Sequence, residues 1–384
     1  MFKPSLLLLA GLFAAGMLFA KPAPPGSTTP SPDSPAGEKK NPPPLDPKNM
    51  DTSVKPQDDF YLYANGNWIK NNPVPPEFSR WAAFTELAER NNNALHDIAE
   101  KAAAVSSKEK DAKQTNLEKA SAADLQKVGD FYASGMNEKA VDSSGAKPLE
   151  AELKRIDGIK DRKDVLKQIA HMHGMSINTF FLFTSGQDDK NSNMVISQAY
   201  QGGLGLPDRD YYTKEDDASK KLRDQYLEHV TKMLTLAGAP AAKASEQAKK
   251  VMALETSLAK PARTRVELRD PQKNYNKMSQ AELQALMPDF NWADYFKELK
   301  IAAPGDINVG QPDFFKAVND IFKTVSLDDA KTYFRWHLLR AMAGTLSKDF
   351  VDENFRFYEA TLRGTKQIKP RWKRVVAKTD EELG

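Results

Sequence analysis

Three prolines between residues 73 and 76 force a break between two stretches that favour helix. Each proline fixes its own φ and biases the preceding residue away from helical geometry, so this segment must cross in an extended form. Before the break, residues 58–68 (DDFYLYANGNW) carry four large aromatic side chains, which suit a short helix packed on a larger body. A second helix can begin only after the prolines, and Ser79 is a fair N-cap for it.

The start of this second helix holds the first candidate site residue, Arg80. It falls in the predicted first turn, where the helix dipole disfavours a cation. The guanidinium is therefore a candidate for binding an anion. The alternative is a surface arginine that folds over Trp81 or pairs with Glu77. The apolar stripe that we expect this helix to bury consists of Phe84, Leu87, Leu95 and Ile98.

Composition narrows the classes of function. A chain of 384 residues with 40% hydrophobic content can build one large or two ordinary domains around a real core. Its 55 basic and 52 acidic residues leave a net charge of only +3, and no basic run suggests binding of nucleic acid. The absence of cysteine excludes disulfides, zinc-thiolate sites and thiol nucleophiles.

The N-terminal residues favour export. Lys3 precedes an apolar run over residues 6–19, which is short for a membrane span, and the spacing predicts a secretory signal over residues 1–20. Because Leu18 stands where a small residue is preferred for cleavage, the alternative is an uncleaved membrane anchor over residues 5–20. Residues 21–49 are rich in proline and serine and predict a disordered linker. The location is then periplasmic or extracellular.

The rest of the chain favours a mainly α fold. Helical spacing of apolar residues recurs over 86–170 and over 217–260, where Gly238 ends one helix. The exception is a β-hairpin near 179–199, because two β-favouring runs flank a polar turn at 186–193. The motif GGLGLPDRDYY at 202–212 follows, and we interpret it as a structural turn without a catalytic role.

No catalytic constellation stands out in the sequence. None of the five histidines is followed by glutamate. His171 and His173 lie two apart, which points them roughly 200° apart on a helix, so polar residues at a helix end are favoured over metal ligands. His96, His229 and His337 are predicted to stand isolated on helical faces, and no serine or threonine has an evident base beside it.

Several phrases in the sequence, in the right order, resemble the neprilysin and endothelin-converting-enzyme family of zinc metallopeptidases. They are residues 56–87, KVGDFYASGMNE at 127–138, the motif at 202–212, INVGQPDFF at 307–315 and PRWK at 370–373. The resemblance covers about residues 50–384. Animal members are disulfide-rich, whereas Gln57, Asn65 and Gly135 stand here where their cysteines are expected, which points to a bacterial-type member.

The resemblance implies a large helical N-terminal lid domain over residues 50–384, of which 50–104 pack on the catalytic body and 105–384 form the lid. In the family a later catalytic half carries His-Glu-x-x-His, whose histidines bind zinc and whose glutamate activates water. That motif is absent here, so we expect a truncated or split enzyme, inactive alone, with zinc only in the complete enzyme.

The resemblance also assigns site residues. Arg80 maps onto the family arginine that pairs with the free carboxylate of a peptide substrate. Phe84 maps onto a residue lining the pocket for the side chain after the scissile bond, although an apolar helix position suits a core slightly better. The implied partners are short peptides and a missing or separate catalytic half. The alternative function is a non-catalytic envelope protein that binds peptides or docks a partner.

Overall fold

The computed structural model describes residues 45–104, 116–302 and 304–384, and the chain divides into two units at Asn72/Pro73. The predicted signal, the alternative anchor and all but the last five residues of the predicted linker therefore lie outside the described residues. At the end of that linker, Pro47–Asn49 form the 3-10 helix η1. No described helix has both the length and the apolar character needed to cross a membrane.

The first unit is built around helix α1, Phe60–Asn71, which the aromatic stretch predicted. Asp59 caps the helix by accepting a hydrogen bond from the amide of Leu62 at 2.9 Å. Asp51 accepts a hydrogen bond from Lys70 Nζ at 2.6 Å, and this bond is the main cause that lowers the pKa of Asp51 to about 2. Gly66 is required for the contact, since an added Cβ would lie 2.6 Å from the Asp51 Cβ.

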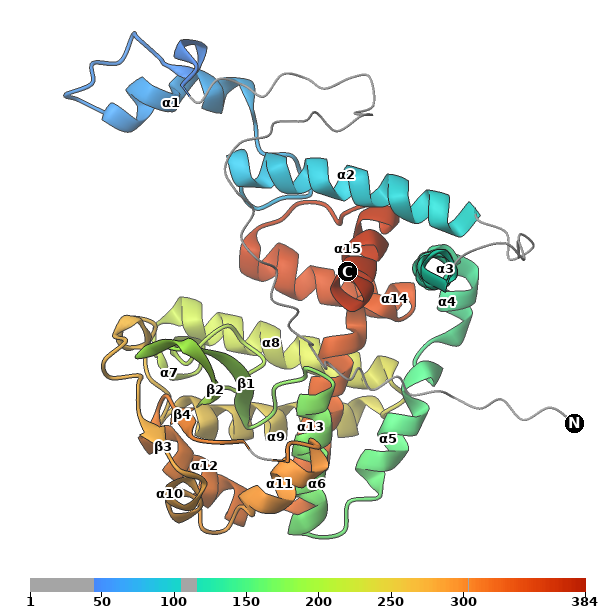
Figure 1. Ribbon diagram of the computed structural model, residues 1–384, viewed down its shortest axis with the longest axis vertical. Helices are drawn as coiled ribbons and strands as arrows, with labels where there is room; N and C mark the ends of the chain where they lie inside the picture. The colour runs from blue at the N-terminus through green and yellow to red at the C-terminus, as the bar shows by residue number, and fades with distance from the viewer. Residues whose placement is uncertain (1–44, 105–115, 303) are drawn as a thin grey trace, which may run out of the picture. The chain divides into compact units, whose positions relative to one another are not determined.

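The second unit is mainly helical, as predicted (Figure 1). Its α-helices are α2 Ala83–Ala104, α3 Asn116–Met136, α4 Glu138–Ser144, α5 Glu150–Asp157, α6 Arg162–Gly174, α7 Asp210–Thr213, α8 Asp217–Leu236, α9 Ala241–Ala259, α10 Gln280–Leu286, α11 Trp292–Glu298, α12 Pro312–Thr324, α13 Leu327–Met342, α14 Lys348–Asn354 and α15 Arg371–Leu383. Short 3-10 turns are η2 Lys147–Leu149, η3 Glu267–Arg269 and η4 Ala343–Thr345, and η5 Phe355–Thr361 is a π-helix.

The predicted hairpin is confirmed as β1, Phe181–Asp188, and β2, Asn191–Gln201. Its turn is shorter than predicted, because Asp188 already pairs with Asn191. Two further strands, β3 Lys277–Met278 and β4 Ile307–Val309, complete a sheet in the order β1-β2-β4-β3, with β4 parallel to β2. Strands of two and three residues carry too little periodicity to be predicted.

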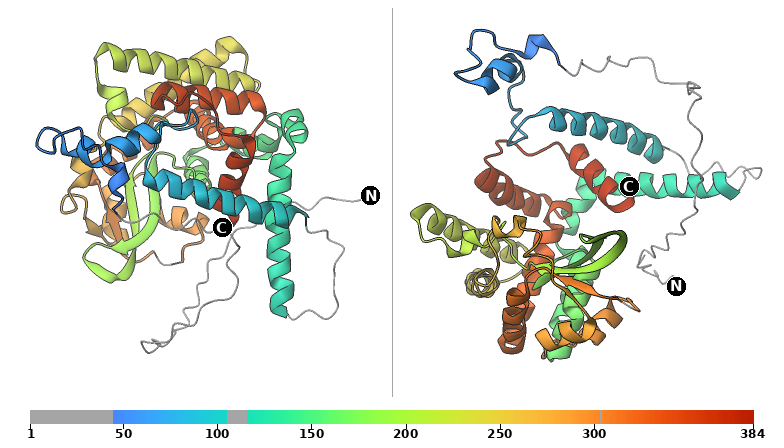
Figure 2. Two further views of the ribbon diagram at one scale, coloured as in Figure 1. Left: turned by 90° about the horizontal axis from the view of Figure 1, so that it is seen from above. Right: turned by 60° about the vertical axis from the view of Figure 1, so that its left-hand side comes forward.

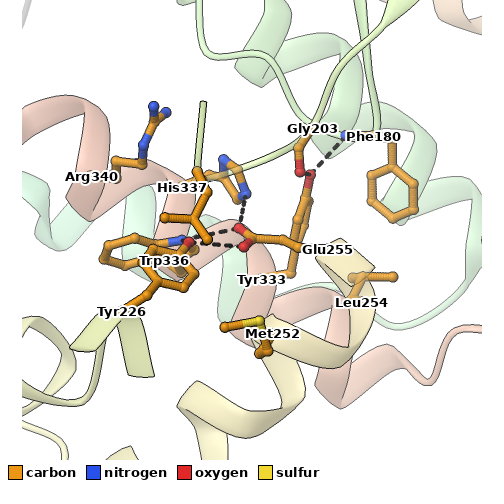
Figure 3. Close-up of polar contacts among 12 residues, drawn as sticks. Phe180, Gly203, Tyr226, Met252, Leu254, Glu255, Tyr333, Trp336, His337 and Arg340 are labelled. Carbon is orange, nitrogen blue, oxygen red and sulfur yellow. Dashed lines mark hydrogen bonds and ion pairs between the residues drawn. The ribbon is translucent and has the colours of Figure 1, made fainter. Parts of the chain in front are cut away.

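A buried carboxylate stands at the centre of the helical core (Figure 3). Glu255 of α9 accepts hydrogen bonds from Tyr212 and Tyr226 at 2.9 and 2.8 Å, and from Trp336 Nε1 and His337 Nε2 at 3.2 and 3.0 Å. Four donors from three helices satisfy an acceptor-only group, so its burial is compensated. The network joins α7, α8 and α13 to α9.

The glycine motif at 202–212 lies against this core and serves close packing. Gly203 has φ +77°, and an added Cβ would lie 2.7 Å from the amide nitrogen of Phe180. At Gly205 an added Cβ would lie 1.8 Å from the hydroxyl of Tyr226, so a side chain would break the Glu255 network. These contacts fit the structural role that the sequence predicted.

Helices α2, α3 and α15 pack together in the same unit (Figure 2). The predicted buried stripe of α2 is wrong for Phe84, Leu87 and Ile98, which are 86%, 45% and 51% exposed, whereas Leu95 is partly buried and packs against the cluster of Ala99, Tyr132 and Val376. Small residues make the contact instead, because an added Cβ on Gly129 of α3 would lie 2.4 Å from the carbonyl oxygen of Ala102. A close helix crossing of this kind needs glycine and alanine, and three of the larger apolar side chains of α2 are left exposed.

Candidate functional site

The candidate site lies on the segment that leads into α2. Residues 73–82 are non-helical, and the rings of Phe78 and Trp81 pack edge to face with centroids 5.0 Å apart. Helix α2 begins only at Ala83, and the carbonyl of Ala82 accepts its first bond, from the amide of Thr85 at 2.8 Å. The prediction that Ser79 caps the helix is therefore wrong, and Arg80 precedes the first turn.

Arg80 is exposed, and the structure shows neither the packing over Trp81 nor the pairing with Glu77 that the alternative interpretation expects. The carboxylate of Glu77 pairs with Lys373 of α15, which also pairs with Glu89 of α2. Burial opposes the charge of Lys373, but the hydrogen bonds to both glutamates outweigh it and raise the pKa of the ammonium group. Among the residues that the structure describes, no carboxylate pairs with Arg80.

Phe84 lies in the first turn of α2, four residues after Arg80, and is 86% exposed. The interpretation that placed Phe84 in a core is therefore wrong for the described residues. A cation and a large aromatic ring stand four positions apart and both face solvent. Such a pair can bind a carboxylate next to an apolar side chain.

The segment bearing Arg80 is held in place by the C-terminal part of the chain. The amides of Lys366 and Gln367 both donate to the carbonyl oxygen of Pro76, at 3.0 and 2.9 Å. Lys369 Nζ lies 4.8 Å from the ring centroid of Phe78, within the range of a cation–π contact. These contacts come from residues that are distant in the sequence, and they fix the position of the segment that carries Arg80.

Comparison with known proteins identifies the family. The family model described as peptidase family M13 matches residues 56–384. The chain belongs to peptidase family M13. The predicted resemblance to neprilysin and endothelin-converting enzymes is thereby confirmed for this N-terminal region.

Relatives within the M13 family agree with the match. Human endothelin-converting enzyme 1 is 31% identical over 351 residues, and Drosophila melanogaster neprilysin-3 is 29% identical over 360. Each alignment covers 88% of this chain but only 43% and 44% of the relative. The chain thus spans less than half the length of these relatives.

A solved structure supports the fold. Zinc metalloprotease Zmp1 of Mycobacterium tuberculosis, in complex with an inhibitor, superposes with a TM-score of 0.78 at 29% identity. The superposition covers 88% of this chain and 50% of the Zmp1 chain. Its open state gives a TM-score of 0.71. The predicted helical N-terminal fold is therefore confirmed.

M13 relatives are zinc metalloproteases, but the donors described here do not fit a zinc site. His171 forms a hydrogen bond with Glu152 at 2.7 Å, and His96 forms one with the hydroxyl of Tyr132 at 3.1 Å. His173 Nδ1 lies 2.7 Å from the hydroxyl of Tyr295 and its Nε2 lies 2.9 Å from a backbone carbonyl. No group of three or more histidine or acidic side chains in the described ranges could hold a metal.

The three histidines predicted to be isolated all have partners, and for His229 and His337 these partners are buried carboxylates, whereas His96 contacts the hydroxyl of Tyr132. His229 Nδ1 lies 2.7 Å from Glu353, and His337 Nε2 lies 3.0 Å from Glu255. The His229–Glu353 and His337–Glu255 pairs could not be predicted from the sequence, because the partners are 124 and 82 residues apart. The same holds for the Glu77–Lys373 pair, which no local signal reveals.

Proposed function

We propose that this chain is the N-terminal portion of an exported zinc metalloendopeptidase of the M13 family that cleaves short peptides. Support comes from relatives named as endothelin-converting enzyme and zinc metalloprotease, of which the chain spans about half. The zinc-binding helix belongs to the half that this sequence does not contain. The present half contributes one wall of the substrate cleft, and a periplasmic or extracellular location follows from the predicted signal.

The observation that carries this proposal is the charge of Arg80, which no described carboxylate pairs, together with the exposed ring of Phe84 four residues later in the chain. A guanidinium fork binds a carboxylate through two parallel hydrogen bonds, so Arg80 would hold the free C-terminus of a peptide. Phe84 would contact the apolar side chain next to it. Because Glu77 is already paired with Lys373, it does not compete for Arg80.

The second candidate is a non-catalytic envelope protein that binds peptides or docks a partner. It is favoured by the extensive buried core within residues 73–384, which includes the satisfied Glu255 network. Under this proposal the chain binds peptides through Arg80 and needs no catalytic half. Both candidates predict that the 384-residue chain alone neither takes up catalytic zinc nor hydrolyses peptides.

The first experiment identifies the native polypeptide by peptide mapping in the envelope and secreted fractions. Peptides that continue past Gly384 into a His-Glu-x-x-His segment support the metallopeptidase. Arg80→Gln in that native protein should then raise KM about tenfold for peptides with a free C-terminus and leave amidated peptides unaffected. The matched control is Arg90→Gln, which changes an exposed arginine on α2.

A native product that ends at Gly384 supports the second candidate. Calorimetric titration of the 384-residue chain should then show binding of free-carboxylate peptides, weakened about tenfold by Arg80→Gln. Zinc uptake with peptide cleavage by this chain alone would contradict both candidates. Equal KM values for Arg80→Gln and Arg90→Gln would contradict the role of Arg80.

A further inference from the structure

A cavity of about 240 Å³ lies between helices α3, α4, α14 and α15, away from Arg80 and Phe84. One side of it is apolar and is formed by Phe131, Val141, Leu346, Val351 and Val375. Gly135 of α3 and Gly344 of η4 also line it and add no side chain to fill it. The space suits a single side chain or a short alkyl group rather than a drug-sized molecule.

Three cations of α15 line the same cavity: Arg371, Arg374 and Lys378. Lys378 is compensated, because Glu381 and Glu382 lie 3.1 and 2.6 Å from its ammonium nitrogen.

Arg371 donates through Nε to the carbonyl oxygen of Gly135 at 2.8 Å and has Glu138 at 4.0 Å. Two of the three cations therefore already have acidic neighbours.

Arg374 is different. Its Nε donates to the carbonyl oxygen of Lys369 at 3.2 Å, and among the described residues its guanidinium pairs with no carboxylate. Burial lowers the pKa of Arg374, and the positive charge of Arg371 lowers it further, against the weaker influence of Asp352 and Glu138. A half-buried guanidinium beside another cation therefore lacks a carboxylate that would neutralise its charge.

We propose that this cavity binds a small monocarboxylate that carries an apolar group and no positive charge. The carboxylate pairs with Arg374 and the apolar group fills the space against Val351 and Val375. One unpaired cation selects a monoanion. A free amino acid is disfavoured, since its ammonium group would face the cations of α15. The ligand is the C-terminal residue of a peptide or a medium-chain fatty acid, which share this chemistry.

The test is a calorimetric titration of the 384-residue chain with N-acetyl-leucine, its amide, octanoate and free leucine. N-acetyl-leucine or octanoate should bind saturably, and the amide and free leucine at least about tenfold more weakly. Arg374→Gln, and Ser134→Trp, which fills the cavity from α3, should each weaken binding about tenfold. Tighter binding of N-acetyl-leucine indicates a peptide terminus, and tighter binding of octanoate indicates a fatty acid.

The matched control is Arg363→Gln. Arg363 lines a neighbouring cavity, which shares Arg374, Gly344 and Val351 with the proposed site. This variant should leave binding unchanged. Equal affinity for Arg374→Gln and wild type, with circular dichroism showing both folded, would overturn the proposal. A loss caused by Arg363→Gln instead of Ser134→Trp, or no saturable binding of either carboxylate, would overturn it as well.

Discussion

Three histidines in or against the core, His173, His229 and His337, are held in the neutral form by their surroundings. Burial lowers the pKa of His173 to about 4, and it also lowers the pKa of His229 and His337. His173 is satisfied as a neutral ring: its Nε2 faces the carbonyl oxygen of Thr179 and its Nδ1 faces the hydroxyl of Tyr295. Burial keeps the pKa of Tyr295 well above its usual range, so this hydroxyl remains a donor to Nδ1.

This arrangement predicts a loss of stability in mild acid. The unfolded chain protonates His173 near its ordinary pKa of 6.5, whereas the folded chain resists protonation down to about 4. The contribution of the neutral His173 ring to the free energy of unfolding is therefore complete above pH 6.5 and is lost as the pH falls to about 4. Relative to His173→Gln, the free energy of unfolding of the wild type should fall by roughly 2–3 kcal/mol across this window.

Urea unfolding of both proteins at pH 7.5, 6, 5 and 4 measures this difference directly. Other groups titrate in both proteins, so their effects cancel in the comparison. Two curves that stay parallel over the whole range would contradict the assigned role of His173.

At the scale of elements, the sequence predicted what local periodicity controls. Helix α8 ends before Gly238, whose φ is +97°, and the β1–β2 hairpin occupies the predicted region. The length of its turn was wrong because the polar residues after Gly186 still pair across the strands.

What local pattern could not predict is which face of a helix meets a partner. The apolar stripe of α2 is real, but Ala99 and Ala102 are the residues buried against neighbouring helices. The candidate site shows the same limit. The sequence located Arg80, but its exposure follows from pairs such as Glu77 with Lys373, which are 296 residues apart.

Gly135 gives a prediction for two elements that are distant in sequence. An added Cβ at this position of α3 would lie 3.5 Å from the Cβ of Val375 on α15, at the short end of the range found in disulfides. The double variant Gly135→Cys/Val375→Cys should therefore form a disulfide where the family resemblance places a cysteine. The crosslink closes a long loop and should raise the free energy of unfolding by roughly 2–5 kcal/mol.

Thiol titration and the shift of the urea midpoint on reduction test this crosslink. Each single variant serves as a control, because it changes the packing at the same contact without closing the loop. Two free thiols in the folded, air-oxidised double variant would show that α3 and α15 do not approach as described.

At the scale of the whole molecule, the described chain leaves three large apolar side chains of one helix exposed. Phe84, Leu87 and Ile98 lie on a common face of α2, since spacings of three and eleven residues return to the same side of a helix. Their exposure of 86%, 45% and 51% is unusual for side chains of this size on one helix. Exposed large apolar side chains such as Phe84 and Leu87, which lie one turn apart, favour association.

The 384-residue chain should therefore self-associate reversibly as its concentration rises, and this face should mediate the association. Sedimentation velocity over a concentration series should show the association weakened at least about tenfold in Phe84→Ser/Leu87→Gln, because each buried apolar side chain contributes about 1.5–3 kcal/mol. The matched control Ala88→Ser/Ala94→Ser changes exposed alanines of the same helix and should associate like the wild type. Equal weakening in both double variants would place the contact elsewhere, and a wild type that stays monomeric throughout would refute the prediction.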